Sequence, residues 1–121
     1  MPDDNVARVA DFLLLHGNGT AESDLIAEQV DRTRSLAAYR GQPILFNEDD
    51  HFDFQAPWNN CLAAVSRHAS WGFFDAGPAV IGSGASGNYR DGYQLVPVNW
   101  QINTPRKQQF FQLVATVTAC S

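Results

Sequence analysis

The sequence predicts a parallel α/β fold, and three observations carry that prediction. Short, continuous apolar runs alternate along the chain with stretches of helical periodicity. A helical stretch follows each run before the next run begins, which is the order of parallel strands joined by crossover helices. Polar residues follow directly after each run, as they do at the carboxyl ends of strands in such folds. These features predict the order β-α-β-α-β-loop-α in a single α/β unit over residues 1–121.

The first strand is expected to end with residues 12–15 (Phe-Leu-Leu-Leu), and residues 5–8 (Asn-Val-Ala-Arg) lead into it. A continuous apolar run is typical of a strand that is buried on both faces. Residues 16–19 (His-Gly-Asn-Gly) have the composition of a turn and end the strand. Apolar positions at helical spacing then predict a helix over 21–39, with Thr20 as its N-cap.

The second strand is predicted at residues 43–46 (Pro-Ile-Leu-Phe) and the third at residues 71–74 (Trp-Gly-Phe-Phe). Both are short apolar runs of the kind that forms buried strands. A helix over about 57–69 separates them, because Pro57 suits a first helical turn and apolar residues share one face.

Residues 76–103 are expected to form an irregular loop, since they are rich in glycine and serine at first and in aromatic residues later. Thr104 and Pro105 are the residue types that cap and open a helix. The last helix is therefore predicted to begin there.

Composition excludes several classes of function. The chain has 13 acidic and 8 basic residues among 121, a formal net charge of −5. A nucleic acid partner is not expected, because such proteins carry a basic patch. A membrane partner is not expected either, because no apolar run approaches the roughly 20 residues that cross a bilayer. No signal peptide is visible, so the cytoplasm is the default location, but the sequence leaves the location open.

The sequence shows no motif for a cofactor. It lacks a phosphate-binding loop of the GxxxxGK type and a dinucleotide-binding fingerprint. Cys61 and Cys120 lack the close spacing of zinc ligands and are interpreted as unpaired thiols. No cofactor and no metal ion are therefore expected.

Polar side chains that could carry chemistry follow the first two strands, where the carboxyl ends of parallel strands form one rim. Glu48 is the main candidate, since a carboxylate held directly after a strand can be a nucleophile or a general base. It could equally be an ordinary loop acid or helix cap. His16 could contact substrate or orient loop backbone. Asn18 and Asn47 could bind sugar hydroxyls or satisfy turn backbone.

A cluster of acids with a histidine follows Glu48 in the sequence. Asp49, Asp50 and Asp53 are interpreted as solvated loop acids or caps. Together with His51 they could bind a divalent ion, but the spacing matches no defined calcium loop.

Aromatic residues near the rim favour a carbohydrate as the partner. Flat apolar rings beside carboxylates and amides suit the C–H face of a sugar ring. Trp71 begins the third strand, Asp75 follows that strand, and Trp58 and Trp100 lie near the rim segments. The alternative is that these rings fill the core, and Trp71 could face either the core or the rim.

Four segments spread along most of the chain support a more specific hypothesis. They are residues 10–19, 43–52 (Pro-Ile-Leu-Phe-Asn-Glu-Asp-Asp-His-Phe), 69–75 and 92–100. These segments resemble the C-terminal part of a bacterial group of uncharacterised TIM-barrel proteins, which are similar to the retaining glycoside hydrolases of clan A.

The resemblance implies that the three predicted strands are strands six, seven and eight of a (β/α)₈ barrel. Glu48 would then be the catalytic nucleophile after strand seven. Trp71 would line the sugar subsite, and His16 would lie near the nucleophile. The other candidates for substrate binding are Asn18, Asn47, His51, Asp75 and Trp100.

One element of the family pattern has no counterpart here. Retaining glycosidases need two carboxyl groups about 5–5.5 Å apart, and the Asn-Glu pair of strand four, which supplies the acid/base, is absent from the sequence. A complete barrel takes about 250 residues. We therefore expect a C-terminal part of a barrel that is inactive alone and that joins the rest of the barrel or assembles with copies of itself. The alternatives are a carbohydrate-binding or scaffold protein without catalysis, and a metal-dependent α/β hydrolase.

Overall fold

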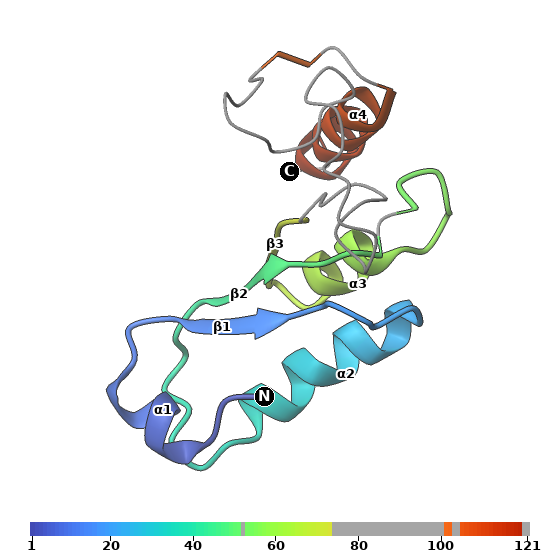
Figure 1. Ribbon diagram of the computed structural model, residues 1–121. Coiled ribbons are helices and arrows are strands. Elements are labelled where there is room, and N and C mark those ends of the chain that lie inside the picture. The colour runs from blue at the N-terminus through green and yellow to red at the C-terminus, as the bar shows by residue number, and fades with distance from the viewer. Residues whose placement is uncertain (52, 74–100, 103–104, 120–121) are drawn as a thin grey trace, which may run out of the picture. The chain divides into compact units, whose positions relative to one another are not determined.

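A three-stranded parallel sheet lies in the N-terminal part of the chain (Figure 1). The computed structural model describes residues 1–51, 53–73, 101–102 and 105–119. The strands are β1 (Leu13–His16), β2 (Ile44–Glu48) and β3 (Ser70–Trp71), in the order β1-β2-β3. Helix α2 (Ser23–Arg34) connects β1 to β2, and α3 (Asn60–Ser66) connects β2 to β3. The predicted α/β class and the alternation of strands and helices are confirmed.

The chain divides into two compact units, Met1–Phe74 and Asp75–Ser121. The first unit contains the sheet and a short helix before it, α1 (Asp4–Val9). In the second unit, the described residues include helix α4 (Pro105–Ala119), which begins at the predicted proline. The predicted irregular loop over 76–103 lies outside the described residues except for 101–102. Among the helices that the structure describes, none has the length and apolar character needed to cross a bilayer.

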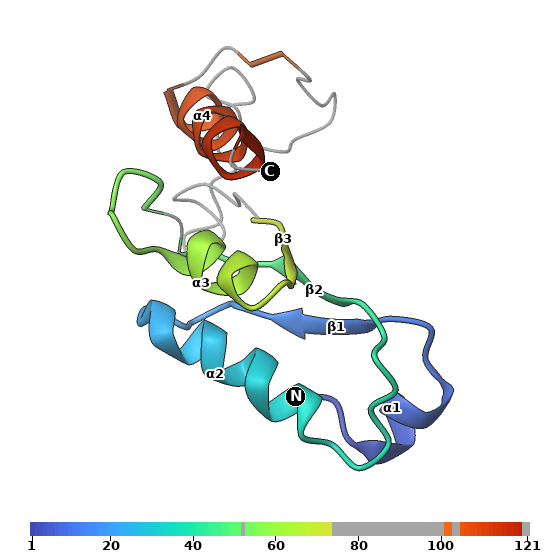
Figure 2. The ribbon, with the colours of Figure 1, turned by 180° about the vertical axis from the view of Figure 1, so that it is seen from behind.

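Helices α2 and α3 cover one face of the sheet. Figures 1 and 2 show α2 running alongside β1 in both views. The core cluster contains Leu13, Leu15, Ile44 and Phe46 from the strands, Ile26, Ala27 and Val30 from α2, and Ala63 and Ala64 from α3. Phe46 is among the largest of these side chains and has no exposed surface. Burial of one such side chain stabilises a fold by about 1.5–3 kcal/mol.

The opposite face of the sheet is not covered by the described residues of this unit. Burial alternates along β1, so that Leu13 and Leu15 are buried while Leu14 is 43% exposed. Phe12, just before the strand, is 52% exposed. The prediction that the first strand is buried on both faces is therefore wrong for this part of the chain. The physical reason is that α2 and α3 both pack against the same face.

The expectation that residues 5–8 lead into the first strand is also wrong, because residues 4–9 form helix α1. Asp3 caps this helix, and its side chain accepts hydrogen bonds from the backbone N–H groups of Asn5 and Val6, both at 3.0 Å. Ala7 anchors the helix to the core with no exposed surface. A good cap and one buried contact are enough to form this short helix.

Both crossover helices are shorter than predicted. Helix α2 begins at Ser23, so Thr20 is not its N-cap, and Glu22 occupies the cap position without a side-chain bond. Helix α3 begins at Asn60 and not at Pro57, because the side chain of Asn59 accepts the hydrogen bond of the first turn. At α3, the cap by Asn59 sets the start of the helix more strongly than the periodicity of the flanking residues does.

Candidate functional site

His16 and Glu48 end their strands and lie beside each other. Leu15 pairs with Phe46 but His16 pairs with Glu48, so Asn47 is an extra residue on β2. A bulge of this kind shifts the alternation of side chains by one residue, and Glu48 therefore shares the face of His16. Nδ1 of His16 lies 3.4 Å from Oε2 of Glu48, and the side chains are 61% and 45% exposed. The bulge thus places an imidazole and a carboxylate together on the uncovered face.

Asn18 and Asn47 are exposed near the same rim. Asn18 lies in the turn that the hydrogen bond from the N–H of Thr20 to the carbonyl of Gly17 closes at 2.9 Å. Asn47 is the bulged residue. Within the described part of the chain neither side chain makes a hydrogen bond, so both amides are accessible to a ligand.

Asp49 is buried, which corrects its interpretation as a solvated acid. Its side chain has no exposed surface. Oδ1 accepts the backbone N–H of His51 at 2.8 Å, and Oδ2 accepts the indole N–H of Trp71 at 2.8 Å. Nδ2 of Asn60 donates to the same carboxylate, at 2.9 Å from Oδ2. A carboxylate with three donor groups around it is a structural centre of this rim.

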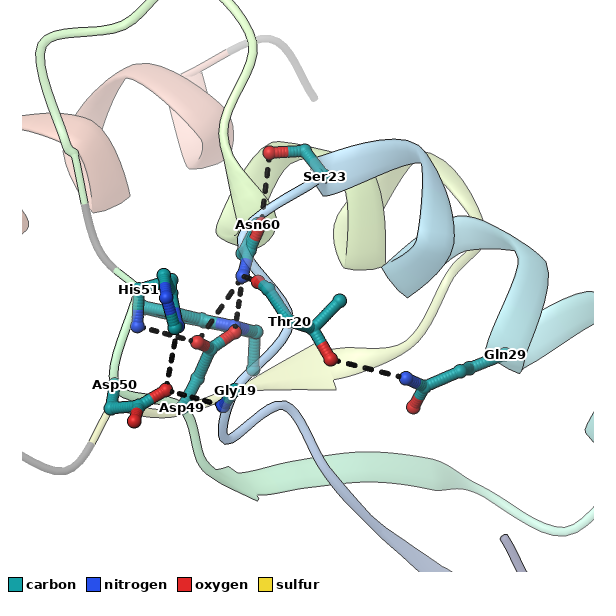
Figure 3. Close-up of polar contacts among 9 residues, drawn as sticks. Gly19, Thr20, Ser23, Gln29, Asp49, Asp50, His51 and Asn60 are labelled. Atoms are coloured by element: carbon teal, nitrogen blue, oxygen red, sulfur yellow. Dashed lines mark hydrogen bonds and ion pairs between the residues drawn. The ribbon is translucent and has the colours of Figure 1, made fainter.

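Asn60 connects three segments through one amide group (Figure 3). Besides Asp49, its Nδ2 donates to the carbonyl oxygen of Thr20 at 2.9 Å, and its Oδ1 accepts the hydroxyl of Ser23 at 2.8 Å. The loop after β1, the start of α2 and the loop after β2 are therefore held together by the first residue of α3. In the sequence Asn60 gives no stronger signal than an amide beside a helix cap, so its role was not predicted.

Asp50 and His51 form a second pair at this rim. Nδ1 of His51 lies 2.6 Å from Oδ1 of Asp50, which also accepts the N–H of Gly19 at 2.8 Å. Partial burial raises the pKa of Asp50, but the hydrogen bonds from Gly19 and His51 and the charge of His51 outweigh it. The pKa of Asp50 therefore lies below its ordinary value of 3.8. The stability that ionised Asp50 contributes is present above that value and is lost as the pH falls through the lower pKa of the folded state.

Potential ligand atoms of Asp49, Asp50 and His51 lie within 4.8 Å of one another. Both oxygens of Asp49 already accept N–H groups, from His51, Asn60 and Trp71, and Oδ1 of Asp50 accepts the N–H of Gly19. A divalent ion would have to displace these donors. This arrangement is a hydrogen-bond network rather than a metal site formed in advance.

Trp71 lies at the rim and also packs on other rings. Its indole N–H reaches Asp49, and its ring centroid lies 6.0 Å from those of both Phe54 and Phe73. The side chain is half-buried. Trp71 pairs with Phe46 of β2, so its side chain lies on the face of the sheet that the helices cover and not on the face of His16 and Glu48. Asp75 and Trp100, the remaining predicted substrate contacts, lie outside the described residues.

Cys61 provides a test of this packing. Burial, with a smaller contribution from the charge of Asp49, raises the pKa of its thiol from 9.0 to about 11. Because the folded chain holds this proton more tightly, stability is expected to fall as the pH rises from 9.0 towards about 11.

The accessibility of the Cys61 thiol can be measured directly. In a Cys120→Ser variant at about pH 8, we expect Ellman's reagent to react about a hundredfold more slowly with the native chain than with the chain in guanidinium. Equal rates would show that Cys61 is accessible.

Comparison with known proteins identifies no relative: no family model, no curated protein and no solved structure matches this chain.

Proposed function

We propose that this chain is the C-terminal part of a (β/α)₈ barrel of the retaining β-glycosidase type and that it carries the nucleophile half of the active site. The observation that carries the proposal is the position of Glu48 beside His16 on the uncovered face of the sheet, at the carboxyl ends of β2 and β1. In a TIM barrel, the face opposite the helices is the barrel interior, and the active site lies at the carboxyl ends of the strands.

The strand arrangement supports the same proposal. The strands are parallel and neighbours in sequence are neighbours in the sheet, as in consecutive barrel strands, although one half of a doubly wound sheet has the same order. The exposed side chains of Phe12 and Leu14 lend further support. Additional strands that closed the cylinder would cover this face with their own inward-facing side chains.

In the proposed reaction, an oxygen of Glu48 attacks the anomeric carbon of a β-glycoside. The bond from that carbon to the leaving oxygen breaks, the leaving group takes a proton from a second carboxyl group, and a glycosyl ester of Glu48 remains. Water then hydrolyses the ester. His16 is placed to orient the carboxylate, and the exposed amides of Asn18 and Asn47 would contact the sugar.

The first test uses the 121-residue chain. We expect no turnover of 4-nitrophenyl β-glycosides above the blank, because Asn47-Glu48 is the only Asn-Glu pair in the sequence and no second one can supply the acid/base. Rapid hydrolysis that disappears in the Glu48→Gln variant would contradict the proposal that the chain carries only the nucleophile half of the active site.

The second test uses a longer polypeptide that joins this chain to strands carrying an acid/base glutamate. There, Glu48→Gln is expected to lower kcat by at least about a hundredfold, since the nucleophile is lost. Glu22→Gln, which changes an exposed glutamate before α2, is the matched control and should leave kcat unchanged. A Glu48→Gln enzyme with the full rate would remove Glu48 from the mechanism.

The second candidate is a carbohydrate-binding or scaffold protein without catalysis, and the accessible amides of Asn18 and Asn47 are compatible with it. It predicts saccharide binding that survives Glu48→Gln and no hydrolysis in the longer polypeptide. In both cases the proposed partners are a carbohydrate and either the remaining barrel strands or a second copy of the chain.

A further inference from the structure

A pocket of about 320 Å³ lies beside the first residues of α2 and α3, and neither Glu48 nor His16 lines it. Small-ligand pockets usually begin at about this size. The polar and aromatic side chains that line it are Ser23, His51, Asp53, Trp58, Asn59 and Asn60. The pocket is thus distinct from the proposed nucleophile.

Carboxylates hold both rings of this pocket in place. The indole N–H of Trp58 donates to Oδ1 of Asp24 at 2.8 Å, and Nδ1 of His51 lies 2.6 Å from Oδ1 of Asp50. Trp58 is nevertheless 45% exposed. Because its N–H is already bonded, Trp58 offers the apolar face of its ring, while His51 offers its second ring nitrogen.

The rest of the pocket consists of hydrogen-bonded amides and carries negative charge. Asn59 and Asn60 are buried, and both amides are bonded within the protein. Asp53 adds an exposed carboxylate, and no lysine or arginine is among the described lining residues. An apolar ring face beside hydrogen-bonding groups fits a polyhydroxylated ring, and the carboxylate disfavours an anion.

We infer that this pocket binds a neutral saccharide ring, stacked on Trp58 and hydrogen-bonded to His51 and Asp53. This inference goes beyond the proposed glycosidase, because it requires binding at a second place and no bond-breaking step. Its test measures binding and not turnover, so its outcome is independent of the reaction proposed for Glu48.

The experiment is an NMR titration of the 121-residue chain with glucose and, separately, with glucuronate, its anionic counterpart. Glucose is expected to shift the signals of Trp58 and His51, and glucuronate to bind about tenfold more weakly. Trp58→Ala should weaken glucose binding by about tenfold. Phe111→Ala, which removes another exposed aromatic ring, is the matched control and should change nothing.

A charge reversal keeps the test decisive if Trp58→Ala does not fold. Asp53 is exposed, so Asp53→Lys should fold and should reduce or invert the preference for glucose over glucuronate. The inference is overturned if glucose shifts neither ring, if Trp58→Ala binds glucose as the unaltered chain does, or if Asp53→Lys leaves the preference unchanged.

Discussion

Asp49→Ala is expected to lower the free energy of unfolding by on the order of 3–6 kcal/mol. The substitution removes the acceptor of three donor groups: the N–H of His51, the indole N–H of Trp71 and the amide of Asn60, which keeps its bond to Thr20. Each unsatisfied donor costs about 1–3 kcal/mol. Because small domains are stable by only about 5–15 kcal/mol, much of the fold's stability would be lost. Urea denaturation followed by tryptophan fluorescence measures the effect.

Two further variants make this prediction specific. Asp49→Asn keeps the shape of the side chain but turns one acceptor oxygen into a donor, which must then face either the N–H of His51 or the indole N–H of Trp71. It should be less destabilising than Asp49→Ala but still well beyond the change of about 0.5 kcal/mol that is usual for surface positions. Asp11→Ala removes an exposed carboxylate and serves as the control. If Asp49→Ala and Asp11→Ala unfolded at the same urea concentration, Asp49 would not be the centre of this rim.

Gly17→Ala is expected to destabilise the fold by about 2–4 kcal/mol. A Cβ at position 17 would lie 2.5 Å from Oδ2 and 2.6 Å from Cγ of Asp49. That carboxylate is held by its hydrogen bonds and has no room to move, so the loop after β1 must shift. The same shift would strain the bond from the N–H of Gly17 to the carbonyl oxygen of Glu48, now 3.0 Å. The midpoint of urea denaturation measures this loss as well.

Gly72→Ala is the matched control for Gly17→Ala. A Cβ at position 72 would meet the carbonyl oxygen of Phe46 at 3.5 Å, which is ordinary contact. Introducing Gly17→Ala into the Asp49→Ala background should cost clearly less than in the unaltered chain, because the clashing side chain is gone. Strictly additive costs in the double variant would mean that Gly17 and Asp49 do not interact as the structure places them.

The alternation of apolar runs and helical periodicity predicted the fold class and the order of the elements because both patterns are local. The start of α4 was also predictable, since Pro105 fixes the backbone where a helix can begin. Helix α1 was not, because its signal is a single cap, Asp3, before a short segment. The burial of the first strand was predicted wrongly, because an apolar run does not show whether helices or other strands cover one face of the sheet or both.

For the side chains at the carboxyl ends of the strands, the sequence likewise predicted position along the chain but not burial. Because the carboxyl ends of parallel strands lie at one edge of a sheet, His16 and Glu48 were expected near each other, and the structure brings them together. Which face Glu48 or Asp49 occupies depends on the bulge at Asn47, and a bulge depends on the pairing of two distant segments. An aspartate that ends in solvent and one that holds three donors look alike in a sequence. The burial of Asp49 could therefore be found only from coordinates.

The uncovered side of the sheet bears on how this polypeptide would behave in a concentrated solution. Phe12 and Leu14 expose apolar surface at the start of β1, which is an edge strand of the sheet. Such surfaces promote association between molecules. The net charge of −5 opposes that association through repulsion, and added salt would weaken the repulsion. Handling at low ionic strength should keep the polypeptide dispersed, and a binding partner for this side would first reveal itself by preventing salt-induced precipitation.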